Sequence, residues 1–160
     1  MGDVLSTAVA DVTAVLRRDL FAVPLAGQTY RAGGRVHPYP PAAPTAPCAW
    51  VEVAAGQSRF DETAWATILD VVVVADGSND AGWELLYALA DRVIALLSSH
   101  RWLDAPAPDS LVTAARARPV DVGGPNLRGL EVTVELLVPA ATMCSDSLSI
   151  PVPATNGGPP

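Results

Sequence analysis

Residues 66–80 constrain the fold more than any other part of the chain. They begin with Ala-Thr-Ile-Leu-Asp-Val-Val-Val-Val-Ala, a run rich in β-branched residues whose single charge is Asp70. Four consecutive valines favour a strand that is covered on both faces. The run is shorter than the ~20 apolar residues that a membrane-spanning helix needs. Asp-Gly-Ser-Asn-Asp at residues 76–80 then predicts a tight turn, because glycine permits positive φ and Asp and Ser bind nearby amides.

The turn leads into residues 80–99, which have helical periodicity. Their apolar stripe spans an arc of about 120° when each residue advances by ~100°. It consists of Leu85, Leu86, Leu89, Val93, Leu96 and Leu97. Asn79 or Asp80 is the candidate N-cap, and acidic side chains suit the positive end of a helix dipole. Because fixing its backbone costs ~1–2 kcal/mol per residue, the helix must dock on a sheet, with the valine strand as the nearest candidate.

Further elements follow from periodicity and turn residues. Residues 3–18 predict a helix with one apolar side, and the final Arg17-Arg18 pair suits the negative end of its dipole better than it suits a phosphate site. Residues 38–47 are rich in proline and predict an extended connector. This interpretation is favoured over a proline-rich docking motif for a signalling domain. Alternation predicts four strands, at residues 35–37, 49–54, 110–118 and 127–138.

The last of these strands has the clearest alternation. It places Leu130, Val132, Val134, Leu136 and Val138 on a core face, opposite Glu131, Thr133 and Glu135 on a wet face. In residues 110–118, alternation places Val112, Ala114, Arg116 and Arg118 on one face. The turn of glycine and proline between the two strands predicts an antiparallel pair.

Residues 56–65 predict a polar loop that carries two large aromatic side chains, Phe60 and Trp65. They either pack at the edge of the core or contact a neighbouring subunit, since aromatic residues are enriched at interfaces. The adjacent acids Asp61 and Glu62 are a conceivable general acid/base pair, although neighbouring carboxylates in a polar loop are more commonly solvated.

Residues 139–160 differ in composition from the rest, with many Pro, Ser, Thr and Gly residues. We expect a domain over residues 1–138 and a flexible tail over 139–160. Within the tail Leu148, Ile150 and Val152 alternate, so this segment could add as a strand to the sheet edge of another chain.

The charge balance and the cysteines exclude several classes of protein. The chain has 160 residues, a formal net charge of −7, ten arginines and no lysine, which argues against a dedicated nucleic-acid binder. Cys48 and Cys144 lie far apart, and two reduced cysteines are favoured over a disulfide. The sequence shows neither the charge and hydropathy pattern of a signal peptide nor that of a membrane-spanning segment, so we expect synthesis in the cytoplasm.

No pattern for catalysis is recognisable. The sequence has neither a glycine-rich phosphate loop nor the Cys/His spacing of a zinc site. His37 and His100 are the only histidines. His100 lies near Ser98, Ser99 and Asp104, but a nucleophilic triad is not indicated, and a helix-capping role suits it better. We therefore expect no enzyme, no catalytic residue, no metal and no cofactor.

Four segments together resemble one family. His-Pro-Tyr-Pro-Pro-Ala-Ala at residues 37–43 leads to Pro-Cys-Ala-Trp-Val at 47–51. Asp-Ala-Gly-Trp-Glu-Leu-Leu follows at 80–86, and the alternating strand from Gly129 to Leu137 closes the pattern. Over residues 1–138 the chain resembles the tail terminator proteins of long-tailed bacteriophages, especially those that infect actinobacteria.

The resemblance implies a single-domain α+β fold, with a mixed, mostly antiparallel sheet and two helices packed on one face. It also implies a virion protein, a homohexameric ring that caps the tail tube and joins it to a head-side connector or head-closure protein. DNA would pass through the lumen without specific binding. Phe60, Trp65, Leu148, Ile150 and Val152 are the predicted subunit-interface residues. Another neck component, or a small ligand-binding or enzymatic α/β domain, is the alternative.

Overall fold

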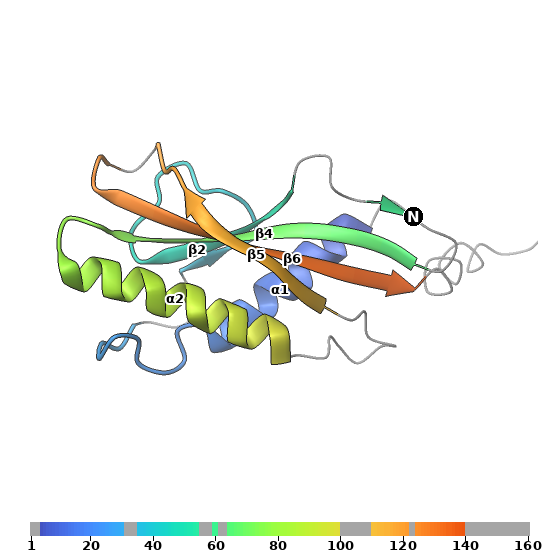
Figure 1. The fold of residues 1–160 in the computed structure, drawn as a ribbon, viewed down its shortest axis with the longest axis horizontal. Coiled ribbons are helices and arrows are strands. Elements are labelled where there is room, and N and C mark those ends of the chain that lie inside the picture. The colour runs from blue at the N-terminus through green and yellow to red at the C-terminus, as the bar shows by residue number, and fades with distance from the viewer. Residues whose placement is uncertain are drawn as a thin grey trace, which may run out of the picture.

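A computed structural model describes residues 4–30, 35–54, 59–60, 64–99, 110–121 and 124–139. In chain order the elements are α1 (Val4–Asp19), β1 (Val36–His37), β2 (Cys48–Val53), β3 (Arg59–Phe60), β4 (Ala64–Asp76), α2 (Asp80–Ser99), β5 (Ser110–Arg118) and β6 (Leu127–Pro139) (Figure 1). The predicted helices at 3–18 and 80–99 and the predicted strands at 35–37, 49–54, 110–118 and 127–138 are therefore confirmed to within about one residue at most ends. Residues 140–160, and with them the predicted tail, lie outside the described residues.

The strands form one mixed, mostly antiparallel sheet, as predicted. Its order is β1-β2-β4-β6-β5, and β3 pairs with β4 beyond the end of β2. Among the described strands only β1 and β2 pair in parallel. The longest pairing joins β4 to β6, from Ala64 opposite Pro139 to Asp76 opposite Leu127. These two strands form the centre of the sheet.

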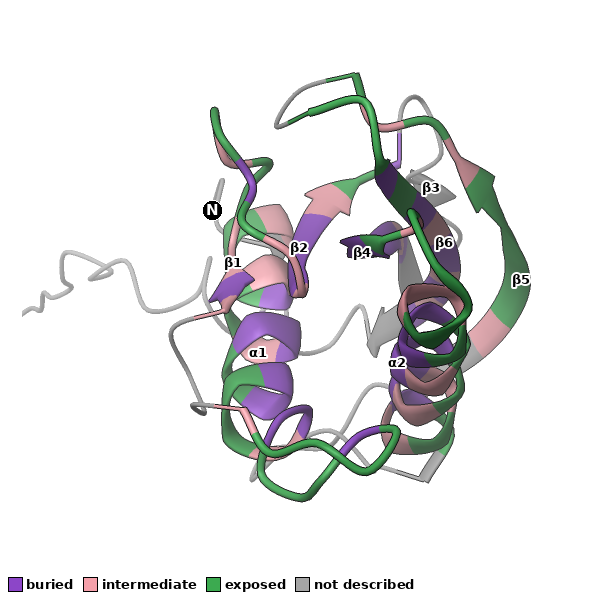
Figure 2. Ribbon diagram, turned by 90° about the vertical axis from the view of Figure 1, so that its left-hand side faces the viewer, coloured by how far each residue is buried: buried purple, intermediate pink, exposed green. Residues whose placement is uncertain are grey.

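Both helices cover the same face of the sheet, which confirms the predicted arrangement (Figure 2). One hydrophobic core joins the inner sides of the helices to alternate residues of the central strands. From the helices it includes Ala8, Val12, Val15, Leu16, Leu85, Leu86, Leu89, Val93 and Leu97, from β2 Val51, and from the two central strands Leu69, Val71, Val73, Val132, Val134 and Leu136. Leu96, predicted on the same stripe, is half-buried at its margin.

The valine strand is buried on both faces, as its composition predicts. Val71 and Val73 face the helices, whereas Val72 and Val74 belong to a second, smaller cluster on the opposite face. No described helix covers that second face. Cys48, Trp50 and Leu127 complete the small cluster, and Ala46 and Val120 from the connecting segments pack against it.

The pairing of β4 with β6 continues past the helical layer. Thirteen residues of strand span ~43 Å, whereas the twenty residues of α2 span ~30 Å. Figure 1 shows the end of the ribbon formed by Ala64 and Pro139 reaching beyond α2, with β3 beside it. This protruding end of the sheet carries the backbone positions Phe60 and Trp65, which are paired with each other.

The turn before α2 forms by local hydrogen bonds. The amide of Ser78 donates to Asp76 Oδ1 at 2.9 Å, and the amide of Gly82 donates to Asn79 Oδ1 at 2.9 Å. Asn79 is therefore the N-cap, which decides between the two predicted candidates. Asp80 occupies the first turn of the helix, where its charge suits the dipole.

Arg92 of α2 forms hydrogen bonds with backbone carbonyls of the segment that follows α1. Its guanidinium donates to the carbonyl oxygens of Leu20 at 3.4 Å, Val23 at 3.0 Å and Pro24 at 3.3 Å, all in the segment that follows α1. This contact satisfies acceptors that a chain leaving a helix cannot pair by itself. It holds the segment after α1 against the side of α2.

Replacing Arg92 by alanine is expected to lower the free energy of unfolding by about 1–2 kcal/mol, because hydrogen bonds from a charged donor to three carbonyls are lost. Chemical denaturation of Arg92→Ala and wild-type protein measures the difference. Arg92→Lys keeps the charge but has no planar fork, so it should recover less than half of the loss. A full recovery by lysine would show that charge alone matters at this position.

The predicted polar loop at 56–65 is wrong in part. Arg59–Phe60 forms β3, and β4 begins at Ala64, so Phe60 and Trp65 both lie in strands. Tertiary pairing along the long β6 strand extends β4 at its beginning, which local composition could not indicate. Residues 55–58 and 61–63, including Asp61 and Glu62, lie outside the described residues.

The predicted face of Val112 is also wrong. A β-bulge lies between Val112, which is opposite Val134, and Ala114, which is opposite Thr133. A bulge inserts one residue and therefore reverses the alternation beyond it. Val112 packs against the helix-side core, whereas Arg116 and Arg118 project from the helix-free face.

Candidate functional site on the helix-free face

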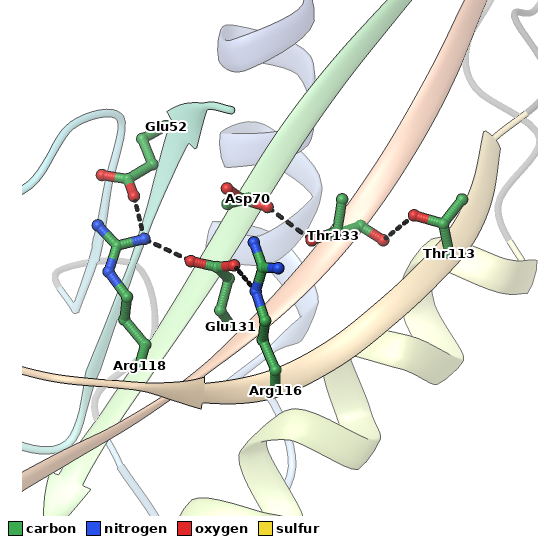
Figure 3. A network of polar contacts seen from close by, with 7 residues as sticks. All are labelled: Glu52, Asp70, Thr113, Arg116, Arg118, Glu131 and Thr133. Carbon is green, nitrogen blue, oxygen red and sulfur yellow. Dashed lines mark hydrogen bonds and ion pairs between the residues drawn. The ribbon is translucent and has the colours of Figure 1, made fainter. Parts of the chain in front are cut away.

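The helix-free face of the sheet carries a cluster of charged side chains at its centre. The strand register brings them together: Glu52 lies opposite Asp70, Asp70 opposite Thr133, and Glu131 opposite Arg116. Four strands, β2, β4, β6 and β5, thus contribute to one site (Figure 3). We call Glu52, Asp70, Glu131, Arg116 and Arg118 the charged cluster.

Two guanidinium groups pair with the carboxylates of Glu52 and Glu131. Arg118 Nη1 lies 2.6 Å from Glu52 Oε1 and also donates to Glu131 Oε2, so it bridges β2 and β6. Arg116 Nε donates to Glu131 Oε1 at 2.6 Å. Each oxygen of Glu131 therefore accepts from a different arginine, as Figure 3 shows.

Glu131 lies beneath the two arginines. Its side chain is 4% exposed, whereas those of Arg118 and Arg116 are 34% and 68% exposed. The sequence predicted Glu131 on a wet face, and this prediction is wrong because the guanidinium groups from β5 and the neighbouring strands cover it. Thr133 and Glu135 of the same row are half-buried.

The cluster fixes the ionisation of Glu131. Burial opposes the charged form, but hydrogen bonds from Arg118 and Arg116 and their charges outweigh it, so the pKa of Glu131 is lowered. The bond to Glu131, together with Glu52, raises the pKa of Arg118 despite partial burial. Both partners are charged at neutral pH. Stability from this pairing is present above the unfolded-state pKa of Glu131 and is lost as the pH falls through its folded-state value.

Asp70 behaves in the opposite way. Burial raises its pKa, and the charges of Glu131 and Glu52 add to this effect, while a hydrogen bond from Thr133 Oγ1 at 2.7 Å and the charge of Arg116 partly offset it. Thr133 in turn accepts at its backbone carbonyl from Thr113 Oγ1 at 3.4 Å. The fold thus opposes the ionisation of Asp70 but favours that of Glu131.

Asp70→Asn is expected to raise the free energy of unfolding at pH 7, because burial opposes the charge of Asp70. Asparagine keeps an acceptor for Thr133 and carries no charge to desolvate. Because the folded-state pKa of Asp70 is raised, the contribution of Asp70 to wild-type stability falls as the pH rises from the ordinary value of 3.8 to the folded value. The advantage of the variant should therefore vanish below about pH 4.

Urea denaturation at a series of pH values measures this effect, and Asp91→Asn on the exposed face of α2 is the matched control. A variant that is less stable than wild type at pH 7 would show that the negative charge of Asp70 is needed by the neighbouring arginines.

The carboxylate oxygens of the charged cluster are spaced as in a cation site, but arginines already neutralise two of the carboxylates. One carboxylate oxygen from each of Glu52, Asp70 and Glu131 lies within 4.8 Å of the others. Hard cations such as Ca²⁺ and Mg²⁺ take such ligands. The carboxylates of Glu52 and Glu131 already pair with arginines, however, and Asp70 accepts from Thr133, so a cation would have to displace Arg118. The geometry is that of an internal ion-pair network that ties β5 and β2 to the central strands.

The small hydrophobic cluster lies at one end of the same face. Trp50 is buried there, and its Nε1 has no acceptor among the described residues. Cys48 is buried and free, and burial raises the pKa of its thiol to about 11 although the charge of Arg35 lowers it. A thiol that stays protonated is a poor nucleophile. Cys48 therefore agrees with the predicted reduced state, while Cys144 lies outside the described residues.

The predicted interface residues are placed only in part. Phe60 and Trp65 lie on the protruding end of the sheet, where the structure gives their backbone pairing. Leu148, Ile150 and Val152 lie outside the described residues. The five residues are not brought together by the described part of the chain, and their role at an interface stays a prediction.

Sequence reasoning missed the charged cluster, although parts of its signal were present. Arg116 and Arg118 were placed on one face of a strand, and Glu131 on its predicted antiparallel partner. The missing information was the register, which puts Arg116 opposite Glu131, and the place of β2 two strands away, which adds Glu52.

Comparisons with known proteins identify a fold but no family. No protein-family model matches the chain, and no curated protein sequence matches it. One solved structure with a similar fold is a chain from the "Virion of native gene transfer agent (GTA) particle". Its TM-score is 0.60 at 19% sequence identity, and the alignment covers 85% of this chain and 98% of that chain. Identity at this level shows a shared fold.

Proposed function

We propose that this protein is a structural subunit of a phage-like virion and not an enzyme. The observation that carries the proposal is the fold, which matches a virion chain over nearly that chain's whole length. The charged cluster is compatible with the proposal, because its arginines and two of its carboxylates pair with one another. No helix of the described residues is long and apolar enough to span a membrane.

More specifically, we propose a tail terminator, a homohexameric ring that caps the tail tube and meets a head-side connector or head-closure protein. The similarity of residues 1–138 to tail terminators supports this role. A ring is built from heterologous contacts, in which one patch of each copy meets a different patch of the next. The protruding end of the sheet, with Phe60 and Trp65, is a candidate for one such patch.

The charge of the chain suits a ring through which DNA passes. A formal net charge of −7 on each copy repels phosphates, so DNA would move through the lumen without being held. The exposed arginine of the charged cluster, Arg116, is already paired with Glu131. It is therefore a weak phosphate ligand.

The decisive experiment measures the mass of the purified protein and images it together with purified tail tube subunits. A tail terminator gives a mass close to six times that of one chain, and rings appear on the ends of shortened tubes. Binding to head-side proteins alone would instead favour another neck component, the alternative from the sequence. A strict monomer that binds a metabolite would overturn the proposal in favour of a small ligand-binding domain.

A further inference from the structure

The outer side of β5 is an open edge of the described sheet. Within the described part of the chain β5 pairs with β6 alone, so alternate N–H and C=O groups on its outer side have no strand partner. Thr113, Ala114, Ala115 and Ala117 are exposed along this strand. Such small side chains allow another strand to approach closely. The outer edge of β5 is thus available for strand addition.

The opposite edge of the sheet is blocked. β1 has two residues and is followed by Pro38, which has no amide proton to donate. The carbonyl of Val36 already accepts from Arg17 Nε at 2.9 Å. The outer side of β1 therefore has few unpaired backbone N–H and C=O groups to which an added strand could bind. The two edges of the sheet therefore differ, and edge-to-edge contact between β5 of one copy and β1 of the next is disfavoured.

The sequence after β6 contains a segment that fits an open edge. Residues 148–153 read Leu-Ser-Ile-Pro-Val-Pro, so apolar residues alternate with Ser149, Pro151 and Pro153. In an extended chain, alternate residues direct their backbone groups to opposite edges. The even residues would then offer N–H and C=O to one side, while the prolines lie on the other. Proline is tolerated in a sheet when its position faces solvent at an outer edge.

We propose that residues 148–152 of one copy add to β5 of the next copy as its outermost strand. The inference rests on the proposed ring, because the edge and the segment are two different surfaces of one chain, as heterologous contacts require. β6 ends near the start of β5, since Ser110 is opposite Leu136. The nine residues that follow Pro139, up to Leu148, can span at most ~30 Å, enough for the segment to extend beyond its own β6.

The faces of the sheet fix the orientation of the added strand. The helix side of β5 presents the exposed Ala115 and Ala117, whereas the opposite side presents Arg116 and Arg118. The apolar side chains of the segment therefore cover the alanines on the helix side. On the new outer edge Pro151 has no amide to donate and Ser149 is the one donor within residues 148–152, so addition of a further strand is disfavoured.

Two variants that introduce the same residue at neighbouring positions test the pairing. Ile150→Pro removes an amide that faces β5, and the ring mass should shift to that of single chains. Ser149→Pro changes an amide that faces solvent, and the ring should persist. Light scattering of the full-length proteins measures both masses, and neither substitution touches the described core. A ring that survives Ile150→Pro would overturn the inference and leave the proposed function standing.

Cross-linking identifies which copy supplies the strand. One tagged chain carries Ala115→Cys or Ala117→Cys, a differently tagged chain carries Ile150→Cys, and both carry Cys144→Ser. A short thiol cross-linker should join the two tags, while Ala114→Cys, on the other face, should give little product. Cross-links confined to one chain of a double variant would overturn the contribution from a neighbour. A wild-type monomer without cross-links between copies would overturn both the inference and the ring.

Discussion

Gly82→Ala should lower the free energy of unfolding by about 3 kcal/mol or more and the Tm by roughly 6–12 °C. A Cβ atom on Gly82 would lie 1.5 Å from the carbonyl oxygen of Asp76 and 2.8 Å from its carbonyl carbon. Asp76 is held as the last residue of β4, opposite Leu127. Because the clash is with backbone, the start of α2 must move away from the sheet.

The matched control for this prediction is Gly77→Ala in the same turn. A Cβ atom there would lie 2.4 Å from Cγ of Arg128, a side-chain atom, while the nearest backbone atom is 3.4 Å away, so Arg128 must change rotamer and the loss should be smaller than for Gly82→Ala. Thermal and urea denaturation of both variants measure the effects. Alanine is the better helix former by ~1 kcal/mol, so without the clash Gly82→Ala would stabilise the protein. An unchanged or higher Tm for Gly82→Ala would contradict the close approach of α2 to β4.

Arg118→Ala should lower the free energy of unfolding by roughly 2–4 kcal/mol, because it leaves the buried carboxylate of Glu131 with only the exposed Arg116 as a partner. Arg118 also bridges to Glu52, so the variant loses the contact between β2 and β5. The cost arises from an uncompensated buried charge. It should therefore shrink when that charge is removed.

The test is a comparison of three variants by urea denaturation at pH 7. Arg116→Ala removes the more exposed partner and should cost about 1 kcal/mol or less. Arg118→Ala combined with Glu131→Gln should be more stable than Arg118→Ala alone, since a neutral amide is cheaper to bury than a carboxylate. Equal losses for Arg116→Ala and Arg118→Ala would show that burial of Glu131 does not set the energetics of the charged cluster.

Local sequence signals predicted most of the fold because several elements agree with their own periodicity. The stripe of α2 and its cap at Asn79, the four valines of β4 and the alternation of β6 each specify one structure. The order of these elements, with the resemblance of residues 1–138, was enough to predict a mixed sheet with two helices on one face. What local signals could not supply was the pairing of strands distant in sequence.

Each error has this origin. Trp65 lies in a strand, and not in the predicted loop, because β6 is long enough to pair with it. Val112 lies on the opposite face from the predicted one because of a β-bulge, which no residue type in the sequence indicates. Glu131 was expected in water because its burial comes from arginines on another strand. The candidate site depends on register across four strands and was therefore the least predictable feature.

The ribbon of β4 and β6 implies a gradient of local opening along its length. Its middle is flanked by β2 and β5 and covered by helices, whereas β3 is the only described strand beside the end at Ala64 and Pro139. Amide hydrogen exchange should be slowest around Val71 and Val132 and become faster toward that end. Contact with another subunit would then protect amides that exchange readily in the isolated chain.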